Sequence, residues 1–316
     1  YCAANDDLAD AEDVCDTLGI PLHRVNFAEE YRQRVFAHFL AEHRRGRTPN
    51  PDILCNKEIK FRAFLDHARR LGADHNATGH YARLTRDDDH TRMLKGRDPD
   101  KDQSYFLHAL SQAQLHDALF PLGDLPKSEV RAIARANDLI THDKKDSTGI
   151  CFIGERDFQA FLARFLPTRP GPMRTPEGET VGEHQGLAFY TLGQRHGLGI
   201  GGRAGDSGEP WYVADKDREH NTLIVVQGDH PLLYRRHLRA GDLHWIGGAP
   251  PALPARLRAK TRYRQPDQDC TLVAIDGDQA EVRFDRPQRA VTPGQSVVFY
   301  RDDECLGGGV IDAGWN

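Results

Sequence analysis

The spacing of hydrophobic residues changes once along this chain of 316 residues, and the change predicts two kinds of fold. Between residues 8 and 134, helical spacing alternates with short extended runs, as in the helix predicted over 61–71 and the strand predicted over 22–27. Beyond Trp211, short extended runs follow one another between turn residues, at 222–227, 256–264, 270–275, 280–284, 296–300 and 305–311. Alternating helices and strands predict a parallel sheet covered on both faces, whereas the later strands predict a small antiparallel barrel.

Length and composition limit the class of protein. A chain of this length is expected to form two or three domains, and no stretch approaches the roughly 20 apolar residues that cross a membrane. The six cysteines form no CxxC pair and no HExxH is present, which argues against a structural zinc site or a zincin. Scattered thiols are expected to be reduced, so we expect a cytoplasmic protein without a membrane partner. Because the formal net charge is −5, any nucleic acid would have to be bound by local basic patches.

The segment 47–58 holds a first candidate for chemistry, Cys55. Two prolines stiffen the loop before it, and a helix is expected to begin just after Cys55 with Asn56 as its N-cap. The dipole of that helix would favour the thiolate, and Asp52 lies close enough along the chain to exchange a proton. The alternative is a well-capped helix start with a buried cysteine, and the residues alone leave both open.

A second candidate, Cys151, lies in the segment 144–154. Polar turn residues and Gly149 place it beside a loop, with two lysines nearby that would suit a reactive thiol. Phe152 and Ile153 instead indicate a short strand that enters a core, where a cysteine would be a small buried hydrophobic residue. Both interpretations remain open.

Two further features suit a nucleotide or RNA. A strand at 75–79 runs into a turn at Gly79, where the backbone could approach a nucleotide closely, although a plain strand–loop corner fits equally well. Every second residue from 256 to 264 is basic, and a period of two would place all five on one strand face: Arg256, Arg258, Lys260, Arg262 and Arg264. Such a row favours an anionic partner such as a phosphate backbone; the alternative is a solvated face neutralised by acids on adjacent strands.

Seven short motifs run in order along the whole chain: NPDILCN at 50–56, ATGHY at 77–81, KDQSYF at 101–106, DSTGICFIG at 146–154, YTLGQR at 190–195, RYRQ at 262–265 and TPGQS at 292–296. Together they resemble the tRNA-specific 2-thiouridylases, which modify the wobble uridine. The resemblance implies an incomplete adenine-nucleotide α-hydrolase-like (ATP-pyrophosphatase) α/β domain over 1–150. It also implies a small central domain over 151–222 and a tRNA-binding antiparallel β-barrel over 223–316.

The resemblance also implies a mechanism. ATP with Mg²⁺ would adenylate the C2 oxygen of the uridine and make it a leaving group. Cys151 would carry a persulfide received from a sulfur-relay or cysteine-desulfurase protein. Its terminal sulfur would attack C2, or be freed as hydrosulfide when Cys55, the nucleophile, attacks the persulfide. The two cysteines would end as a disulfide, which requires their Cα atoms to approach within about 7 Å.

Roles for individual residues follow from the same resemblance. Asn50, Pro51 and Asp52 would contact the target base, with Asp52 as the acid/base, and Gly79 would line the ATP site. No residue is assigned to a metal. The tRNA would be contacted by His80, Lys101, Asp102, Gln103, Arg262, Tyr263 and Gln295.

The chain departs from the family at its beginning. The family carries a glycine- and serine-rich phosphate loop after its first strand, and no such motif precedes the first helix here. We therefore expect this polypeptide by itself to be inactive, and a natural N-terminus upstream of Tyr1 stays open. Two other functions stay open as well: another adenylating ATP-pyrophosphatase, which would not need the two cysteines, and a non-catalytic RNA-binding protein without the ATP loop.

Overall fold

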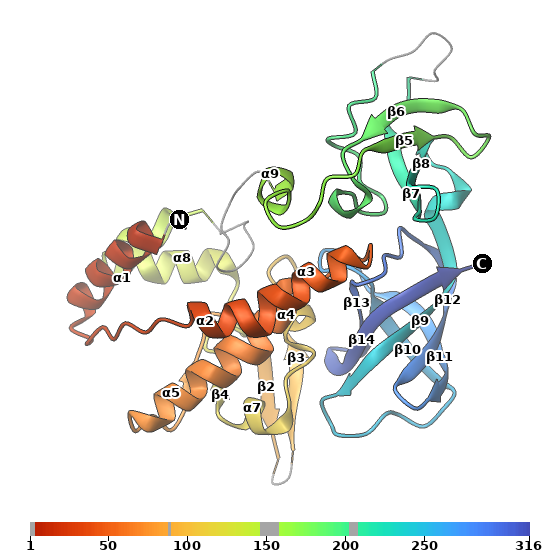
Figure 1. The fold of residues 1–316 in the computed structure, drawn as a ribbon. Helices are drawn as coiled ribbons and strands as arrows, with labels where there is room; N and C mark the ends of the chain where they lie inside the picture. The colour runs from red at the N-terminus through yellow and green to blue at the C-terminus, as the bar shows by residue number, and fades with distance from the viewer. Residues whose placement is uncertain (1–3, 88–89, 146–157, 202–207) are drawn as a thin grey trace.

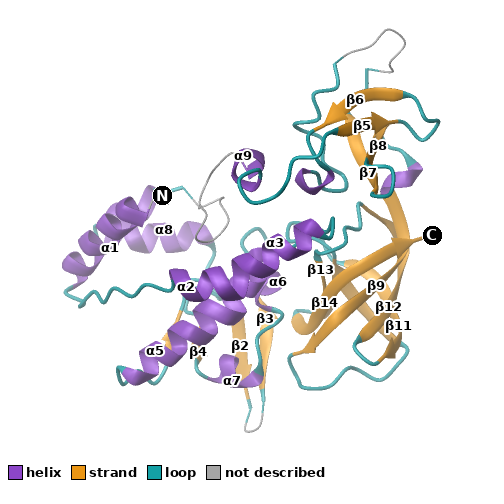
Figure 2. Cartoon of the chain, in the orientation of Figure 1, coloured by secondary structure: helices purple, strands orange, loops and turns teal. Residues whose placement is uncertain are grey.

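The computed structural model describes residues 4–87, 90–145, 158–201 and 208–316, which form three regions. Figure 1 shows most of the helices gathered on one side, strands β9 to β14 on the other, and the sheet of β5 to β8 beyond one end of those strands. Colouring by secondary structure separates the helical region from the two strand-rich regions (Figure 2). Cys151 and the rest of the motif at 146–154 lie outside the described residues.

The helices are α1 Ala4–Leu18, α2 Ala28–Tyr31, α3 Ala37–Arg44, α4 Pro51–Cys55, α5 Phe64–Arg70, α6 Ser104–Leu107, α7 Gln112–His116, α8 Lys127–Ala136 and α9 Phe158–Leu162. The strands are β1 Asn76–Ala77, β2 Ala82–Arg86, β3 Thr91–Lys95, β4 Ala118–Leu119, β5 Gly171–Arg174, β6 Thr180–His184, β7 Trp211–Asp217, β8 Thr222–Gln227, β9 Tyr234–Trp245, β10 Ala255–Lys260, β11 Gln268–Asp276, β12 Gln279–Arg289, β13 Ser296–Arg301 and β14 Glu304–Trp315. The π-helical segments Arg32–Phe36 and Asn56–Ala63 join α2 to α3 and α4 to α5, so each pair reads as one longer helix.

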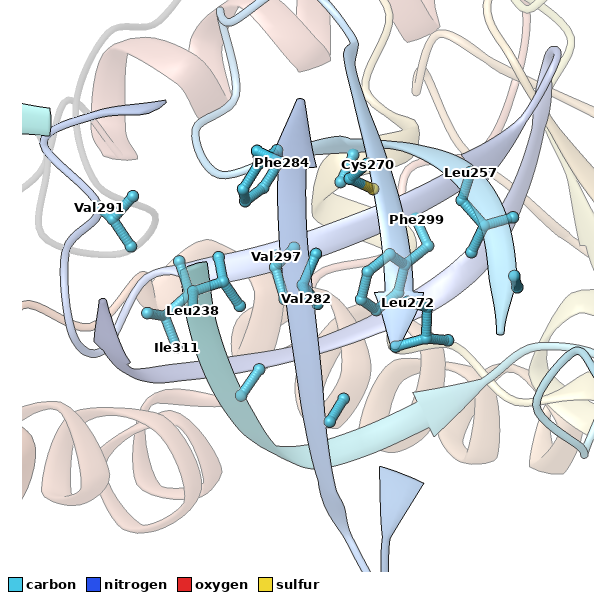
Figure 3. Close-up of a cluster of buried hydrophobic side chains, with 14 residues drawn as sticks. Leu238, Leu257, Cys270, Leu272, Val282, Phe284, Val291, Val297, Phe299 and Ile311 are labelled. Carbon is cyan, nitrogen blue, oxygen red and sulfur yellow. The ribbon is translucent and has the colours of Figure 1, made fainter. Parts of the chain in front are cut away.

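Six antiparallel strands close the C-terminal barrel in the order β13-β10-β11-β12-β9-β14, because β13 also pairs with β14. Along β12 the side chains of Ala280, Val282 and Phe284 are buried while their neighbours are exposed, as the period of two requires. Figure 3 shows Phe284, Leu272 and other apolar side chains filling the space between these strands. The predicted antiparallel barrel is confirmed, but the run predicted over 222–227 as one of its strands is β8, which pairs with β5 and β7 outside the barrel. The barrel instead includes β9, which the sequence patterns did not predict.

The barrel sheet continues into the α/β region. Strand β3 pairs with β14 through Leu94 opposite Glu304 and Met93 opposite Cys305, and β2 pairs with β3 as a hairpin. Met93 and Cys305 are both buried in a core that helices α6 and α7 also share. The α/β region therefore packs directly on the barrel.

The α/β region contains a parallel pair of strands, as predicted. Asn76 and Ala77 of β1 pair with Ala118 and Leu119 of β4. The strand predicted over 22–27 is wrong, because these residues form a loop and Leu22 and Val25 are exposed. A strand needs a neighbour to satisfy its backbone, and none of the described strands pairs with this loop.

The central region is a four-stranded sheet in the order β6-β5-β8-β7. Its core includes Met173, Val213 and Leu223, and Phe39 and Leu40 of α3 pack into the same cluster. Helix α3 thus joins the helical region to the central sheet. No helix among the described residues is long and apolar enough to cross a membrane.

Candidate functional site

A groove of about 1470 Å³ lies between the α/β region and the barrel. Most of its lining comes from four stretches of chain: one face of the helix that begins with α4, the turn after β1, the segment 95–103 and the barrel segment 260–267. The structure therefore brings together, from four separate motifs, these predicted site residues: Asp52, Gly79, His80, Lys101, Asp102, Gln103 and Tyr263.

The helix that carries Asp52 begins earlier than the sequence predicts. Asn50 is its N-cap, and the Oδ1 of Asn50 accepts a hydrogen bond from the N–H of Asp52 at 3.1 Å. Pro51 occupies the first helical position, where its missing N–H is no loss. The prediction that the helix begins after Cys55 with Asn56 as N-cap is wrong. Cys55 lies beyond the first turn, so the unsatisfied N–H groups at the helix start do not reach its thiol.

Cys55 is fully buried in a small cluster with Tyr31, Val35 and Ile59. It does not line the groove, whereas Asp52 on the same helix does. The buried-cysteine alternative therefore describes this conformation. Because Cys151 lies outside the described residues, the approach of the two thiols stays a prediction.

The turn after β1 delivers Gly79 and His80 to the groove. A Cβ on Gly79 would meet only Leu122 among the described residues, at 3.8 Å, so a side chain here would project into the groove. Burial, and then the nearby charge of Lys60, lower the pKa of His80 to about 3. The ring is neutral at physiological pH, and its Nδ1 lies 2.9 Å from the Oγ1 of Thr78. His80 can exchange a hydrogen bond with a ligand but offers no positive charge.

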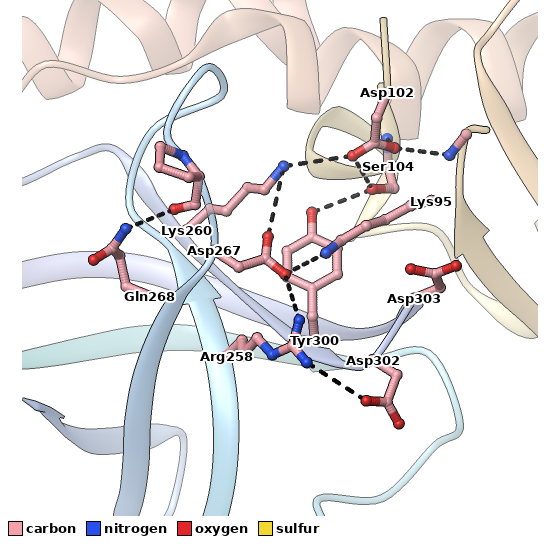
Figure 4. Close-up of polar contacts among 12 residues, drawn as sticks. Lys95, Asp102, Ser104, Arg258, Lys260, Asp267, Gln268, Tyr300, Asp302 and Asp303 are labelled. Atoms are coloured by element: carbon pink, nitrogen blue, oxygen red, sulfur yellow. Dashed lines mark hydrogen bonds and ion pairs between the residues drawn. The ribbon is translucent and has the colours of Figure 1, made fainter. Parts of the chain in front are cut away.

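The carboxylate of Asp102 orders the segment 96–104 from inside (Figure 4). Its Oδ1 accepts hydrogen bonds from the N–H groups of Gly96 at 3.0 Å and Ser104 at 3.1 Å, and its Oδ2 accepts one from the hydroxyl of Ser104 at 3.1 Å. Gln103 is also turned inward, since its Oε1 accepts the N–H of Tyr81 at 3.0 Å. Direct contacts of Asp102 and Gln103 with tRNA stay predictions.

The prediction that five cations share one strand face is wrong. Strand β10 ends at Lys260, and residues 261–265 form a turn, so Arg262 and Arg264 leave that face. Acids neutralise the other three. Arg256 pairs with Asp285; Arg258 and Lys260 lie 3.9 Å and 3.8 Å from carboxylate oxygens of Asp267, which Lys95 also contacts (Figure 4).

The remaining predicted tRNA contacts lie at the edge of the barrel. Arg262 donates hydrogen bonds to the carbonyls of Leu192 at 2.7 Å and Ala290 at 3.1 Å, and burial lowers the pKa of its guanidinium. Tyr263 stacks at a tilt against Phe106, with ring centroids 4.3 Å apart. The Nε2 of Gln295 donates to the carbonyl of Thr48 at 2.6 Å. Their contacts with tRNA stay predictions.

Comparisons with known proteins agree along the whole chain. Family models described as the tRNA methyl transferase HUP domain, the tRNA methyl transferase PRC-barrel domain and the aminomethyltransferase beta-barrel domain match residues 1–155, 159–227 and 235–311. The tRNA-specific 2-thiouridylase MnmA of Methylococcus capsulatus is 63% identical over 100% of this chain and 86% of its own length. The proteins of the same name from Chromohalobacter salexigens and Marinobacter nauticus are each 60% identical over 100% of this chain, and 83% and 81% of their own lengths are covered.

The chain belongs to the tRNA-specific 2-thiouridylase family. The resemblance read from the seven motifs is thereby confirmed, and so is the fold class of an α/β domain, a small middle domain and a β-barrel.

The groove of this family member also contains cations outside the seven motifs, among them Lys60, Arg97 and Lys127. Lys60 follows Asp52 and Asn56 at helical spacing, so the correct helix start would have placed it on the groove face. Arg97 lies in a loop and Lys127 is the first residue of α8, and no sequence pattern around either residue indicated that it would line the groove. No three His, Cys, Asp or Glu side chains gather as a metal-binding group in the part of the chain that is described.

Proposed function

We propose that this chain catalyses the ATP-dependent 2-thiolation of the wobble uridine of tRNA. The observation that carries the proposal is the groove itself, which joins Asp52, Gly79 and the 101–103 segment to Tyr263 of the barrel. These residues belong to motifs shared with relatives named tRNA-specific 2-thiouridylase, at 60% to 63% identity.

The charge of the groove suits an RNA substrate despite the acidic chain. Its lining has eight basic side chains, Lys60, Arg83, Lys95, Arg97, Lys101, Lys127, Lys260 and Arg264, against five acidic ones, Asp52, Asp100, Asp102, Asp267 and Asp303. Phosphate oxygens are attracted to such a local excess. Tyr263 and Phe106 add aromatic surface on which an unstacked base can lie. A base leaving its stack would then be read by Asn50, Pro51 and Asp52.

The residues around Gly79 fit an adenine nucleotide. The position has no side chain where one would project into the groove, so a flat base can approach the backbone. When bound, ATP would supply the adenylyl group that turns the C2 oxygen of the uridine into a leaving group. Mg²⁺ would accompany the phosphates, because this ion is usually held by one or two carboxylates together with phosphate oxygens. Asp52, on the groove face of its helix, would take up or return the proton.

Sulfur transfer would use the two cysteines in sequence. The terminal sulfur of a Cys151 persulfide would attack C2 and expel the activated oxygen. The thiolate of Cys55 would then attack the Cys151 sulfur, breaking the S–S bond and leaving the terminal sulfur on the uridine. The resulting disulfide would need two electrons from a cellular thiol, and a sulfur-relay or desulfurase protein would reload Cys151. Such reduced-thiol chemistry fits a cytoplasmic enzyme.

The burial of Cys55 adds a condition to this scheme. The thiol is covered by Tyr31, Val35 and Ile59, so the helices that hold this cluster must open before Cys55 can reach another sulfur. Substrate binding would supply that rearrangement.

Replacing the cysteines in the full-length gene tests the proposal. We expect Cys55→Ser and Cys151→Ser each to abolish 2-thiouridine in tRNA from cells that depend on the variant, as measured by mass spectrometry of tRNA nucleosides. Cys15→Ser is the matched control, since Cys15 lies on α1, is not among the residues that line the groove, and is only partly buried. Normal 2-thiouridine with either active-site variant would refute the two-cysteine mechanism. RNA binding without any thiolation by the wild type would favour the non-catalytic alternative.

A further inference from the structure

Three residues just before α4, Gly46 to Thr48, are held by both of the other regions of the protein; we call them the junction segment. From the central sheet, the Nζ of Lys216 donates to the carbonyl of Gly46 at 3.2 Å. From the barrel, the carbonyl of Pro293 accepts the N–H of Thr48 at 2.9 Å, and the Nε2 of Gln295 donates to the carbonyl of Thr48 at 2.6 Å. The backbone of the junction segment thus depends on partners far away in sequence.

The side chain of Arg47 strengthens the same junction. Its guanidinium pairs with the buried carboxylate of Glu42 on α3 at 2.7 Å and with Asp312 on β14 at 2.9 Å, and it lies 3.3 Å from the carbonyl of Ile311. Only 24% of the Arg47 side chain is exposed. A planar guanidinium can span two acceptors in this way, whereas a lysine ammonium reaches one place at a time.

The barrel turn that meets the junction segment is built for close approach. Gly294 has a φ of +93°, and a Cβ there would lie 2.8 Å from the nitrogen of Thr48. A side chain at 294 would therefore be strained by the backbone angle and would also collide with Thr48. Figure 1 shows the end of α3 meeting the barrel strands and the central sheet at this place.

The helix that follows the junction segment is also held at residues 56–61, after its first turn. Asn56 donates to the carbonyl of Phe106 at 3.1 Å, and Gln114 donates to the carbonyls of Lys57 at 2.9 Å and Phe61 at 3.0 Å. Its first turn, which carries Asp52, lies only four residues after Thr48. That turn is therefore held on its N-terminal side by the barrel, through the junction segment, and on its C-terminal side by the bonds of Asn56 and Gln114.

We propose that Gln295 and Arg47 are positioning residues, which hold the junction segment so that Asp52, in the first turn of α4, faces the groove. The proposal rests on the proposed function for its kinetic consequence. It assigns Gln295 a different role from the tRNA contact that the family resemblance implies, because one N–H of its amide donates to the carbonyl of Thr48 and so ties the side chain to the junction segment. Loss of either side chain should slow the chemical step while leaving the binding of tRNA intact.

The test uses the full-length enzyme with Gln295→Ala, Gln295→Glu and Arg47→Lys, and exposed Gln185→Ala as the control. The glutamate has the same shape but its ionised carboxylate cannot donate to the Thr48 carbonyl. We expect each of the three variants to thiolate tRNA roughly tenfold more slowly in a single turnover, with a Kd for tRNA within about twofold of the wild type, since small misplacement of reacting groups is costly. Amide hydrogen exchange over residues 46–56 should speed up in the same three variants and not in the control.

Two outcomes would overturn the proposal. A tRNA Kd that rises as much as the rate falls would make Gln295 a tRNA contact. Unchanged hydrogen exchange over 46–56 in all three variants would show that the junction segment is held by other groups. The exchange measurement needs no turnover, so a wild-type enzyme that makes no 2-thiouridine would count against the proposed function alone. Melting temperatures identify a variant that fails to fold, and that variant is left out. Gln295→Glu and Arg47→Lys then decide the case: a slower single turnover with an unchanged Kd for tRNA in both supports the proposal, and any other result in both overturns it.

Discussion

Three buried histidines should make the fold sensitive to mild acid. Burial lowers the pKa of His108 and His43 to about 4 and that of His80 to about 3, from an ordinary value of 6.5. In the unfolded chain these rings take up protons as the pH falls below 6.5, whereas in the folded chain they stay neutral until about pH 4. The unfolded state therefore binds more protons between these values, and the free energy of unfolding falls as the pH falls.

The magnitude follows from the same pKa values. Between pH 7 and pH 5.5, each histidine reduces the free energy of unfolding by about 1.2 kcal/mol, so the three together remove about 3.6 kcal/mol. His184 and His244, whose pKa values burial also lowers, act in the same direction. Carboxylates contribute little in this range, because they stay ionised in both states above pH 5.5.

Urea unfolding followed by fluorescence at the two pH values measures this difference. His108→Gln should reduce the difference by about 1.2 kcal/mol, whatever its effect on stability at pH 7, because it removes one titrating ring. His23→Gln is the control, since His23 is exposed and solvent surrounds it in both states. A wild type that loses less than about 1 kcal/mol between pH 7 and pH 5.5 would refute the reasoning, and so would an undiminished difference in His108→Gln.

Other variants test the packing and the charges. Phe284→Ala should cost about 3 to 5 kcal/mol of unfolding free energy by leaving a cavity in the barrel, and a calorimetric cost below about 1 kcal/mol would contradict the described core. Asp267→Asn removes the carboxylate that Lys95 and Lys260 share at largely buried positions, so it should cost about 3 kcal/mol of unfolding free energy, although Lys260 keeps Asp102 at 3.5 Å. Asp285→Asn, at an exposed pair, should cost much less, and equal costs in urea unfolding would argue against the Asp267 network. Lys60→Ala and Arg97→Ala should each reduce the slope of log tRNA affinity against log salt by about 0.7 to 1, and an unchanged slope would remove that residue from the tRNA path.

Most barrel strands were predictable because each shows apolar and polar residues in alternation within its own sequence. The alternation of buried and exposed residues along β12 is visible in the sequence, since each strand has one face in the core. Strand β9 was missed because three polar residues in a row, Arg235, Arg236 and His237, follow Tyr234 and break the alternation of apolar and polar residues. The strand predicted over 22–27 was wrong for the opposite reason: its apolar residues have the right spacing but no pairing partner among the described strands.

Several groove residues lie in motifs that the sequence singles out, but the way these motifs come together was not predictable. The prolines before Cys55 predicted a helix that starts only after the cysteine. Pro51 at the first helical position instead favours a helix that starts there. Because the helix starts earlier than predicted, Cys55 lies inside it and in a buried cluster rather than at its N-terminal end. The inward hydrogen bonds of Gln103 with Tyr81 and of Gln295 with Thr48 join segments that lie apart in sequence, so no local pattern could reveal them.

The pairing of β3 with β14 has a consequence for how the protein can be divided. A cut at the sequence boundary before residue 223 would separate the two strands and leave Met93 and Leu94 on an open edge. Unpaired backbone groups beside a buried methionine invite association with other chains. The N-terminal piece should therefore aggregate when it is produced alone, and the smallest well-behaved unit that contains the groove should include the barrel.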